Sequence, residues 1–245
     1  MNRPSEIKLF ATRPHQCSYL SGREATTVFI DPNLPMDRYL YSQLSDRGFR
    51  RNGRHVFRPH CAHCQACIAT RLPVHRFTPN RTQRRLLRRN EDITLQLLPN
   101  LDDDATYQLY HDYICQRHAD GDMHPPDREQ YLEFLSPEWH TTQYLGFYRE
   151  ERIIAVAVID RLLHGLSAVY TFFDTSEPKR SLGSWVILQQ IALARSLQLD
   201  YLYLGYWIKE SPKMAYKGLF QPLEVLRDGQ WMANEEAPVP PPRAR

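Results

Sequence analysis

Residues 166–205 read LSAVYTFFDTSEPKRSLGSWVILQQIALARSLQLDYLYLG, and this stretch decides the fold. Its first part, 166–174, has the β-branched and aromatic composition typical of a strand. Pro, Ser and Gly in 176–184 indicate a turn, and apolar residues at helical spacing over 185–197 predict a helix. A second strand is expected over 201–205. The stretch therefore predicts a strand–turn–helix–strand unit.

More elements are predicted on either side of this unit. A strand is expected over 93–97, followed by a helix that begins at Asp102 and ends before Gly121, with acidic residues in its first turn as the helix dipole favours. Three further elements are predicted: strands over 143–148 and 152–160, which form a hairpin, and a short helix near 213–217. Mixed elements in this order indicate an α/β fold.

This order is the one in which GNAT acyltransferases build their acyl-donor site. In that fold the sheet splays between two strands, and backbone N–H groups at a helix N-terminus bind phosphate oxygens. Arg180-Ser-Leu-Gly183 stands where that cradle is expected, so Arg180, Ser181 and Gly183 are candidate donor-binding residues. A glycine before a helix also serves as a cap, and the motif alone leaves both interpretations open. Because no second glycine follows at Ser184 or Trp185, a phosphate donor other than coenzyme A is allowed, including the CCA end of a tRNA.

Charge is distributed unevenly along the chain. Residues 1–90 hold 17 Lys and Arg against 5 Asp and Glu, a net charge of +12, whereas the remainder carries −9. A basic front part indicates a polyanion partner, and the acidic remainder favours a defined footprint over loose adhesion. We therefore expect a smaller, basic, Cys-containing domain over 1–90 and a GNAT-like catalytic domain over 91–236. The proline-dominated tail, 237–245, is expected to be disordered.

A basic helix is predicted at the end of the front part. Arg81, Arg84, Arg85 and Arg88 fall at the spacing i, i+3, i+4, i+7, which places them on one helix face. A solvated charged face is the plain interpretation. Together with the wider basic excess, the pattern favours contact with tRNA phosphates.

Three cysteines, Cys61, Cys64 and Cys67, are packed at two-residue spacing. Tetrahedral zinc and cubane iron–sulfur clusters need four ligands, and Cys17 is the preferred fourth because it lies in the same basic part. Cys115 is the less favoured alternative because it lies in the predicted helix of the other part, and His60 or His63 could substitute in a zinc site. Buried free cysteines that bind nothing are the competing interpretation. A zinc or iron–sulfur cofactor is therefore a candidate, and the chemistry expected below does not require it.

Secretion and membrane insertion are not expected. The longest uncharged apolar run, 153–159, is too short to span a bilayer, and the N-terminus lacks the apolar core of a signal peptide. Free cysteines suit a reducing compartment. A cytoplasmic location and no membrane partner are the expectation.

Eight short motifs together resemble the aminoacyl-tRNA–protein transferases, and within them the bacterial aspartate/glutamate leucyltransferase branch, related to the eukaryotic arginyltransferases. They cover the chain from about residue 17 to about residue 226. The motifs are Cys17–Arg23, Gly48–Gly53, Cys61–Arg71, Arg117–Asp122, Tyr170–Asp174, Arg180–Gly183, Tyr203–Ile208 and Lys213–Lys217. The resemblance implies leucyl-tRNA as donor and proteins with N-terminal Asp or Glu as acceptors, which thereby gain a destabilising N-terminal residue. Eukaryotic relatives carry a Cys-x-x-Cys where this chain has Cys17-Ser-Tyr-Leu20, so the metal binding described for them does not transfer directly.

An aminoacyl ester is already activated, so the enzyme has mainly to position a neutral amine and to stabilise the oxyanion. A carboxylate or a Tyr suffices as proton acceptor, because an α-amino group titrates at about 7.7 to 8.0. Asp174, at the end of the strand predicted over 166–174, and Tyr206, after the strand predicted over 201–205, are the candidate catalytic groups. A turn or cap role is the alternative for Asp174.

The acceptor's carboxylate side chain requires a cation, preferably a bidentate arginine. The candidate substrate-binding residues are Arg23, Arg76, Lys213 and Lys217, with Tyr216 inside the same motif as the two lysines. Surface solvation is the plain interpretation for each lysine.

Two rival functions remain open at this point. A GNAT acyltransferase that uses acetyl-CoA would bind coenzyme A and ignore ribonuclease. A non-catalytic RNA-binding protein would bind tRNA without extending a peptide, although standard RNA-recognition signatures are missing. The residues alone do not distinguish leucine from another donor amino acid.

Overall fold

The computed structural model describes residues 7–121, 123–137, 139 and 141–235. Within these residues the chain forms three sheets, of eight, four and two strands. The tail expected over 237–245 lies outside the described residues.

The largest sheet forms the centre of the molecule, with the strand order β14-β13-β7-β12-β11-β10-β9-β8. Its strands are β7 (Ile68–Pro73), β8 (Ile93–Leu98), β9 (Thr142–Arg149), β10 (Arg152–Arg161), β11 (Gly165–Phe173), β12 (Tyr201–Trp207), β13 (Glu224–Arg227) and β14 (Gln230–Ala233). Within the described part of this sheet, β11 and β12 are the one parallel pair of neighbours.

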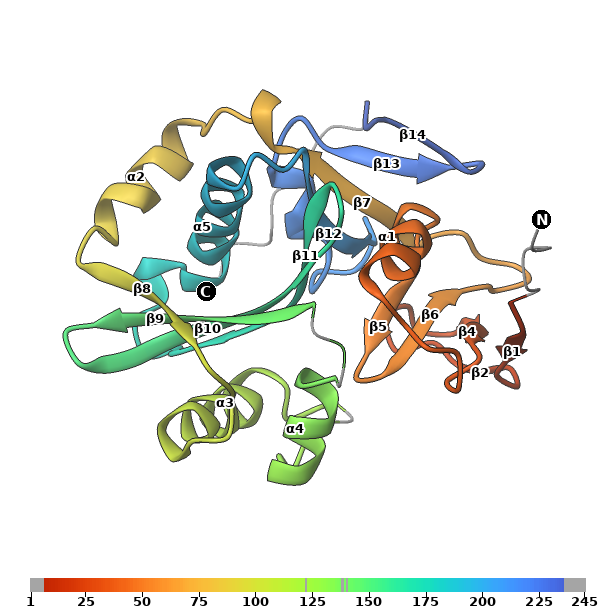
Figure 1. Cartoon of the computed structure of the whole chain (residues 1–245), viewed down its shortest axis with the longest axis horizontal. Coiled ribbons are helices and arrows are strands. Elements are labelled where there is room, and N and C mark those ends of the chain that lie inside the picture. Colours follow the sequence, from red (N-terminus) through yellow and green to blue (C-terminus); the bar gives the residue numbers. More distant parts are fainter. Residues whose placement is uncertain (1–6, 122, 138, 140, 236–245) are drawn as a thin grey trace.

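Helices cover both faces of this sheet (Figure 1). On one face lie α2 (Arg81–Arg89) and α5 (Leu182–Ser196), and on the other lie α3 (Asp104–Arg117) and α4 (Arg128–Leu135). Alternate residues of β10 feed the two apolar cores: Ala157 and Ile159 belong to the core under α5, and Val156 and Val158 to the core under α3. This is the period-2 alternation of a strand that is buried on both faces.

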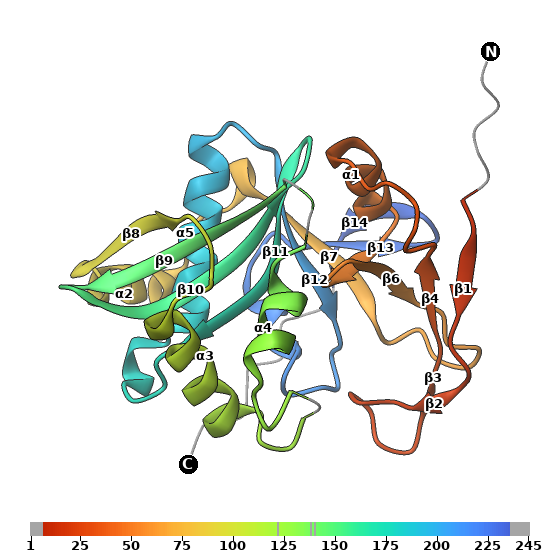
Figure 2. The same cartoon turned by 60° about the horizontal axis from the view of Figure 1, so that its bottom comes forward.

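A small basic part packs at one end of the large sheet, on the right in Figure 2. It contains a four-stranded sheet in the order β1-β4-β6-β5, one helix and a two-stranded ribbon. Its elements are β1 (Leu9–Ala11), β2 (His15–Gln16), β3 (Glu24–Ala25), β4 (Thr27–Ile30), α1 (Arg38–Asp46), β5 (Arg50–Asn52) and β6 (His55–Pro59). Three 3-10 turns complete the described elements: η1 (Val74–Arg76), η2 (Pro178–Arg180) and η3 (Ala215–Leu219).

A buried ion pair joins the small part to the large sheet. Arg51 of β5 donates from Nε and Nη2 to the two carboxylate oxygens of Asp160 on β10, at 2.7 and 3.0 Å, and both side chains are fully buried. Two elements that precede residue 90 also pack with the second half of the chain. The strand β7 pairs with β12 in the large sheet, and the helix α2 packs against α5. The domain division at that residue stays a prediction.

Most of the predicted elements of the second half are confirmed, and the mixed α/β class with them. The strands β8, β9, β10 and β11 correspond to those predicted over 93–97, 143–148, 152–160 and 166–174. Every observed end lies within one residue of the predicted end. The helix α5 begins at Leu182, three residues before the predicted start, because Ser181 adopts a left-handed conformation (φ 46°) that ends the preceding turn. No helix among the described residues is long and apolar enough to cross a membrane.

Candidate active site where two strands part

The large sheet opens between β11 and β12. The two strands pair only where Gly165–Ser167 lies beside Tyr201–Tyr203, although β11 continues to Phe173 and β12 to Trp207. Beyond that point β11 stays paired with β10 and β12 with β7. The carboxyl ends of two parallel strands therefore separate, and a crevice of this kind is where open α/β sheets bind ligands.

Arg50 of the small part inserts its guanidinium at the point where the strands separate. It donates from Nη1 to the Ser167 hydroxyl at 3.1 Å and to the Tyr203 carbonyl at 3.5 Å, and from Nη2 to the Ala168 carbonyl. Carbonyls that lose their ladder partners here are thereby satisfied, as buried backbone groups must be. Arg50 has no acidic partner among the described residues.

Gly205 makes room for this guanidinium. Its φ of +77° lies in the left-handed region, next to a bulge in the pairing of β12 with β7. A Cβ built at this position would lie 3.1 Å from Cζ of Arg50. Glycine is therefore favoured both by the backbone conformation and by the close approach of the side chain.

Lys217, on η3, lies beside the same opening and is 6% exposed. Its ammonium donates to the Tyr206 carbonyl at 2.6 Å and lies 3.8 Å from the sulfur of Met214. Burial and the charge of Arg50 lower its pKa to about 7, although Cys67 opposes the shift. Like Arg50, Lys217 has no acidic partner in the described part of the chain.

Tyrosine side chains and a histidine also lie near this opening of the sheet. Burial raises the pKa of Tyr216 to about 12, with Tyr113 acting in the same direction and Arg50 against it. His118 Nε2 lies 3.3 Å from the hydroxyl of Tyr113. Burial, and then the charges of Lys213 and Arg117, hold the pKa of His118 below its ordinary value of 6.5, so the imidazole is neutral at neutral pH.

The cysteines of the small part lie together near this opening. Burial raises the pKa of Cys67 to about 12, and the neighbouring Cys17, Cys61 and Cys64 act in the same direction. In the residues that the structure describes, no three His, Cys, Asp or Glu side chains are arranged to hold a metal ion. The zinc or iron–sulfur assignment stays a prediction, and no chemical step is built on it.

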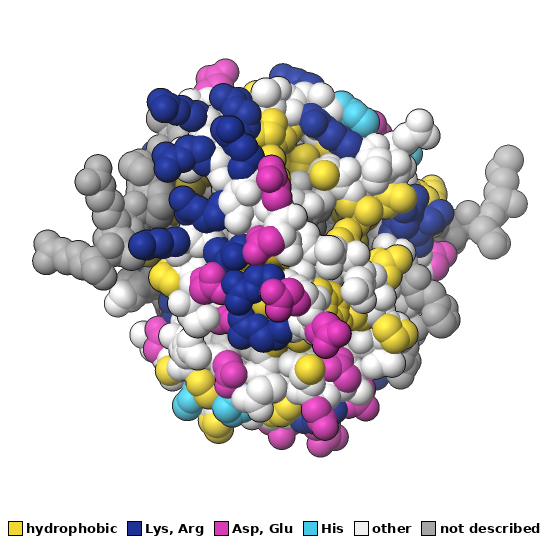
Figure 3. Space-filling model, turned by 90° about the vertical axis from the view of Figure 1, so that its left-hand side faces the viewer, with side chains coloured by type: hydrophobic (Ala, Val, Ile, Leu, Met, Phe, Trp, Pro, Cys, Tyr) yellow, Lys and Arg dark blue, Asp and Glu magenta, His cyan; other side chains and the backbone are white. Residues whose placement is uncertain are grey.

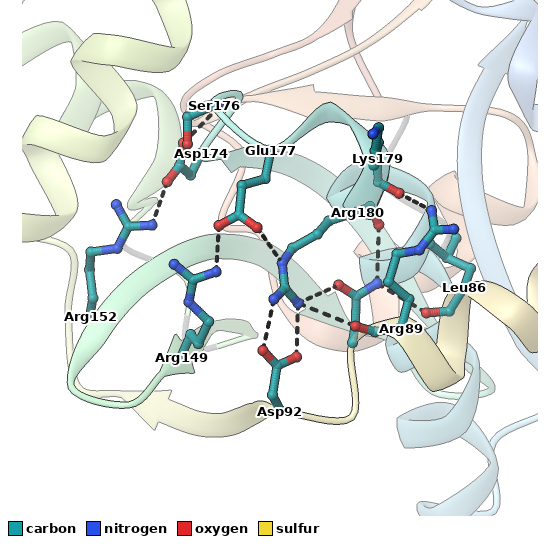
Figure 4. A network of polar contacts seen from close by, with 11 residues as sticks. Leu86, Arg89, Asp92, Arg149, Arg152, Asp174, Ser176, Glu177, Lys179 and Arg180 are labelled. Atoms are coloured by element: carbon teal, nitrogen blue, oxygen red, sulfur yellow. Dashed lines mark hydrogen bonds and ion pairs between the residues drawn. The ribbon is translucent and has the colours of Figure 1, made fainter.

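The guanidinium of Arg180 is held by several hydrogen bonds and ion pairs around the turn before α5 (Figure 4). It binds Asp92 through two parallel bonds of 2.8 Å and Glu177 through Nε at 2.8 Å, while Glu177 also binds Arg149. The carboxylates raise the pKa of Arg180. The guanidinium fixes the turn between β11 and α5, and this placement weighs against its predicted role as a free phosphate ligand.

Gly183 and Ser181 also have structural explanations. Gly183 lies inside α5, where an added Cβ would come within 2.9 Å of the Phe173 ring, so the missing side chain allows the helix to pack on β11. Ser181 is the left-handed residue before the helix. The motif thus has a packing role, and its role in phosphate binding stays a prediction.

The two residues predicted to be catalytic are both engaged elsewhere. Asp174 accepts from Arg152 at 2.8 Å and from the Ser176 backbone N–H at 2.8 Å; burial would raise its pKa, but these bonds hold it below its ordinary value. Tyr206 donates its hydroxyl proton to the Gly48 carbonyl at 2.7 Å, and burial raises its pKa. Both placements weigh against proton transfer by these groups, because neither side chain is free to receive a proton.

The remaining predicted substrate-binding cations differ in their position relative to the opening of the sheet. Arg76 is exposed and lies 3.9 Å from Glu224, beyond the end of β7 where β11 and β12 are still paired. Lys213 pairs with Asp120 at 3.0 Å on the surface. Arg23 donates to the Cys64 sulfur at 3.3 Å, and this bond raises its pKa. Of the predicted cations, Lys217 is the one buried at the opening.

The predicted basic helix is confirmed as α2. Asn80 caps it, its Gln83 and Leu86 are buried, and the four predicted arginines are exposed. Figure 3, which faces the side that carries α2 in Figure 1, shows a group of Lys and Arg side chains with few acidic ones among them. Arg81, Arg85 and Arg88 have no ion-pair partner among the described residues, so this surface is available to an anion.

Two surface cavities lie away from this opening. They border α4 and the β5–β6 hairpin, have volumes of about 290 and 350 Å³, and share Arg54 and Glu133 in their walls. Neither includes Arg50 or Lys217. We place the candidate site at the opening of the sheet, because the cations without acidic partners lie there.

Comparison with known families agrees with this arrangement. The family described as arginine-tRNA-protein transferase matches residues 15–85 with its N-terminal part and residues 105–227 with its C-terminal part. The aspartate/glutamate leucyltransferase of Saccharophagus degradans is 54% identical over 93% of this chain and 97% of that protein. The protein of the same name from Teredinibacter turnerae is 52% identical over 95% of this chain and 96% of its own length. This chain belongs to the arginine-tRNA-protein transferase family. Its relatives place it in the aspartate/glutamate leucyltransferase branch, and it is a transferase.

A solved structure overlaps in part with this family member. L-PGS from Bacillus licheniformis is 14% identical, covers 59% of this chain and 48% of its own, and has a TM-score of 0.46. An overlap of this extent does not decide the fold. It adds nothing on substrates.

Sequence reasoning on this family member missed Arg50. The residue lies in the motif Gly48-Phe-Arg-Arg-Asn-Gly53, which the resemblance included without a role for either arginine. Its partners Ser167, Ala168 and Tyr203 are more than 110 residues away along the chain. The available signal was Gly205, a glycine inside a strand pattern, because such a residue indicates a bulge or a close approach.

Proposed function

We propose that this chain transfers leucine from leucyl-tRNA to the α-amino group of proteins that begin with Asp or Glu. The modified proteins then carry an N-terminal leucine, which marks them for degradation. Family membership and the names of relatives at about 50% identity support the reaction class. The structural observation that carries the proposal is the opening of the sheet, where Arg50 and Lys217 lie without acidic partners.

The donor is proposed to approach from the side of α2. Exposed arginines on this helix suit the phosphates of a tRNA, since charge-assisted bonds from Arg to phosphate are strong and independent of base sequence. The Arg180 network links the C-terminal end of α2 to the turn before α5 through Asn90 and Asp92. A tRNA held on α2 would therefore be fixed relative to the opening beside β11. This arrangement supports a GNAT-like layout for the second half.

The acceptor is proposed to place its first residue at the opening. In the reaction the neutral α-amine attacks the ester carbonyl, a C–N bond forms, and the C–O bond to the terminal ribose breaks. The ribose hydroxyl leaves with a proton, and the amine loses one. Neutral His118 is the proton acceptor that the geometry favours over Asp174 and Tyr206, because its imidazole forms no ion pair among the described residues and burial holds its pKa below 6.5, although Asp120 acts against this shift.

The test mixes purified protein, leucyl-tRNA and a peptide that starts with Asp, and weighs the peptide with and without ribonuclease. We expect a mass gain of one leucine residue that ribonuclease abolishes. An acetyl gain in the presence of acetyl-CoA, insensitive to ribonuclease, would support the acetyltransferase rival instead. Binding of tRNA without any mass gain would support the non-catalytic rival.

A further inference from the structure

Arg50 and Lys217 form an unusual pair because both are cations without acidic partners at an opening of the sheet. Lys217 is almost completely buried, and Arg50 is half-buried. A buried charge is costly unless it is paired, and most buried lysines and arginines have a carboxylate within reach. Here the acceptors are the carbonyls of Ala168, Tyr203 and Tyr206, the hydroxyl of Ser167 and a thioether.

Both side chains have N–H groups beyond those used in the hydrogen bonds above. A guanidinium has five N–H groups, and the bonds of Arg50 use Nη1 and Nη2 but not Nε. An ammonium has three, and Lys217 has one strong acceptor, the Tyr206 carbonyl. The guanidinium of Arg50 lies against Gly205, and Lys217 binds the carbonyl of the next residue, Tyr206, so the two cations meet at the same point of β12. The charge of Arg50 also acts to lower the pKa values of Lys217, Tyr216 and Tyr19. An anion that entered this surrounding would be met by two positive groups and by tyrosine rings.

We propose that Arg50 and Lys217 together bind the side-chain carboxylate of the acceptor's first residue, and so select Asp and Glu over Asn and Gln. This assignment rests on the proposed function, since it names the group that reads the acceptor. The two members come from different parts of the chain: Arg50 from β5, and Lys217 from η3 after β12.

The donor supplies two other charged groups, and neither suits this pair of cations as well. The leucyl residue carries an α-ammonium, which two cations would repel. Phosphates at the CCA end are anions, but exposed arginines on α2 already offer them a more accessible surface. A carboxylate is also the planar partner for which a guanidinium edge is shaped.

The decisive measurement is the ratio of kcat/KM for a peptide that starts with Asp to that for the matched peptide that starts with Asn. This ratio does not depend on the fraction of enzyme that is folded. It is measured with leucyl-tRNA for the wild-type protein, Arg50→Gln and Lys217→Met. Arg47→Gln is the matched control, because Arg47 is an exposed arginine three residues before Arg50.

We expect each site variant to reduce the ratio about 10- to 100-fold, the effect of removing a hydrogen bond to a charged group. The control should keep the wild-type ratio, and the KM for leucyl-tRNA should stay unchanged in all three variants. The proposal is overturned if both site variants retain the wild-type ratio. It is also overturned if the KM for leucyl-tRNA rises while the ratio stays constant, because Arg50 and Lys217 would then bind phosphate.

Failure of the proposed function would look different, since the wild-type protein would then transfer no leucine to any peptide. In that case calorimetric binding of the Asp and Asn peptides to the wild-type protein and to Lys217→Met decides the question. Tighter binding of the Asp peptide that Lys217→Met abolishes would support carboxylate binding by the two cations without the transfer reaction. Equal binding of the two peptides by the wild-type protein would overturn it.

Discussion

Replacement of Gly205 by Ala tests whether the left-handed glycine holds Arg50 in place. An alanine at φ +77° costs about 1 kcal/mol. Its Cβ would lie 3.1 Å from Cζ of Arg50, so the guanidinium must shift. The bonds to Ser167, Ala168 and Tyr203 would weaken, each worth about 1 kcal/mol. Loss of about two of these gives a total cost near 3 kcal/mol.

Gly229→Ala is the matched control for this change. Gly229 has φ +75°, and a Cβ there would meet nothing within 4 Å. It therefore carries the conformational cost of about 1 kcal/mol without the contact. The difference between the two variants, about 2 kcal/mol, isolates the displacement of Arg50.

Thermal unfolding of both variants measures this difference. One kcal/mol corresponds to about 2 to 4 °C for a chain of this size, so Gly205→Ala should melt about 4 to 8 °C below Gly229→Ala. The Asp-over-Asn ratio of kcat/KM should fall in Gly205→Ala and stay at the wild-type value in Gly229→Ala. Equal melting temperatures for the two variants, or an unchanged ratio in Gly205→Ala, would refute the reasoning.

Three further predictions concern other parts of the molecule. Arg51→Met should destabilise the protein by about 3 to 5 kcal/mol in urea unfolding, because it leaves Asp160 charged and buried without its partner; a loss under about 1 kcal/mol would contradict this. Burial lowers the pKa of Lys217 from 10.5 to about 7, so the penalty for its charge is fully present below pH 7 and is relieved as the pH rises toward 10.5. The wild-type protein should therefore gain about 1 kcal/mol per pH unit relative to Lys217→Met between pH 7.5 and 9.5, and parallel stability curves would argue against it. Glutamine at Arg81, Arg84, Arg85 and Arg88 of α2 should reduce the slope of log Kd against log salt for leucyl-tRNA by about three, and an unchanged slope would place the tRNA elsewhere.

Local patterns predicted the second half well because each element there carries its own signal. The alternation along β10 and the apolar period along α5 are properties of contiguous residues. The helix α4 was missed, although Asp127 caps it, because eight residues give too few turns for a clear period. In the small part the strands are two to five residues long, and strands of this length are set by their tertiary partners more than by their own composition.

The candidate site was predicted less completely for a related reason. A pattern of residues places side chains on elements, but it does not show which charged groups neutralise one another after folding. Arg180 and Lys213 had to be judged as free cations from the sequence, and the structure pairs them with Asp92 and Asp120. Lys217 could be proposed from its motif. Its burial without an acid followed only from the placement of β12 and η3.

Two adjacent arginines of β5 connect the small part to the opening of the large sheet. Side chains of consecutive strand residues point to opposite faces, so Arg50 and Arg51 extend in opposite directions from one short strand. Arg51 is fixed by the buried carboxylate of Asp160 on β10, and Arg50 then enters the gap beside Ser167 on β11. Because Asp160 and Ser167 lie directly opposite each other across the paired strands β10 and β11, the two arginines bind neighbouring positions of one hairpin. Recognition of the acceptor thus depends on a docking contact that has no substrate role of its own. Any change that loosens Arg51 should reduce the Asp-over-Asn ratio together with stability.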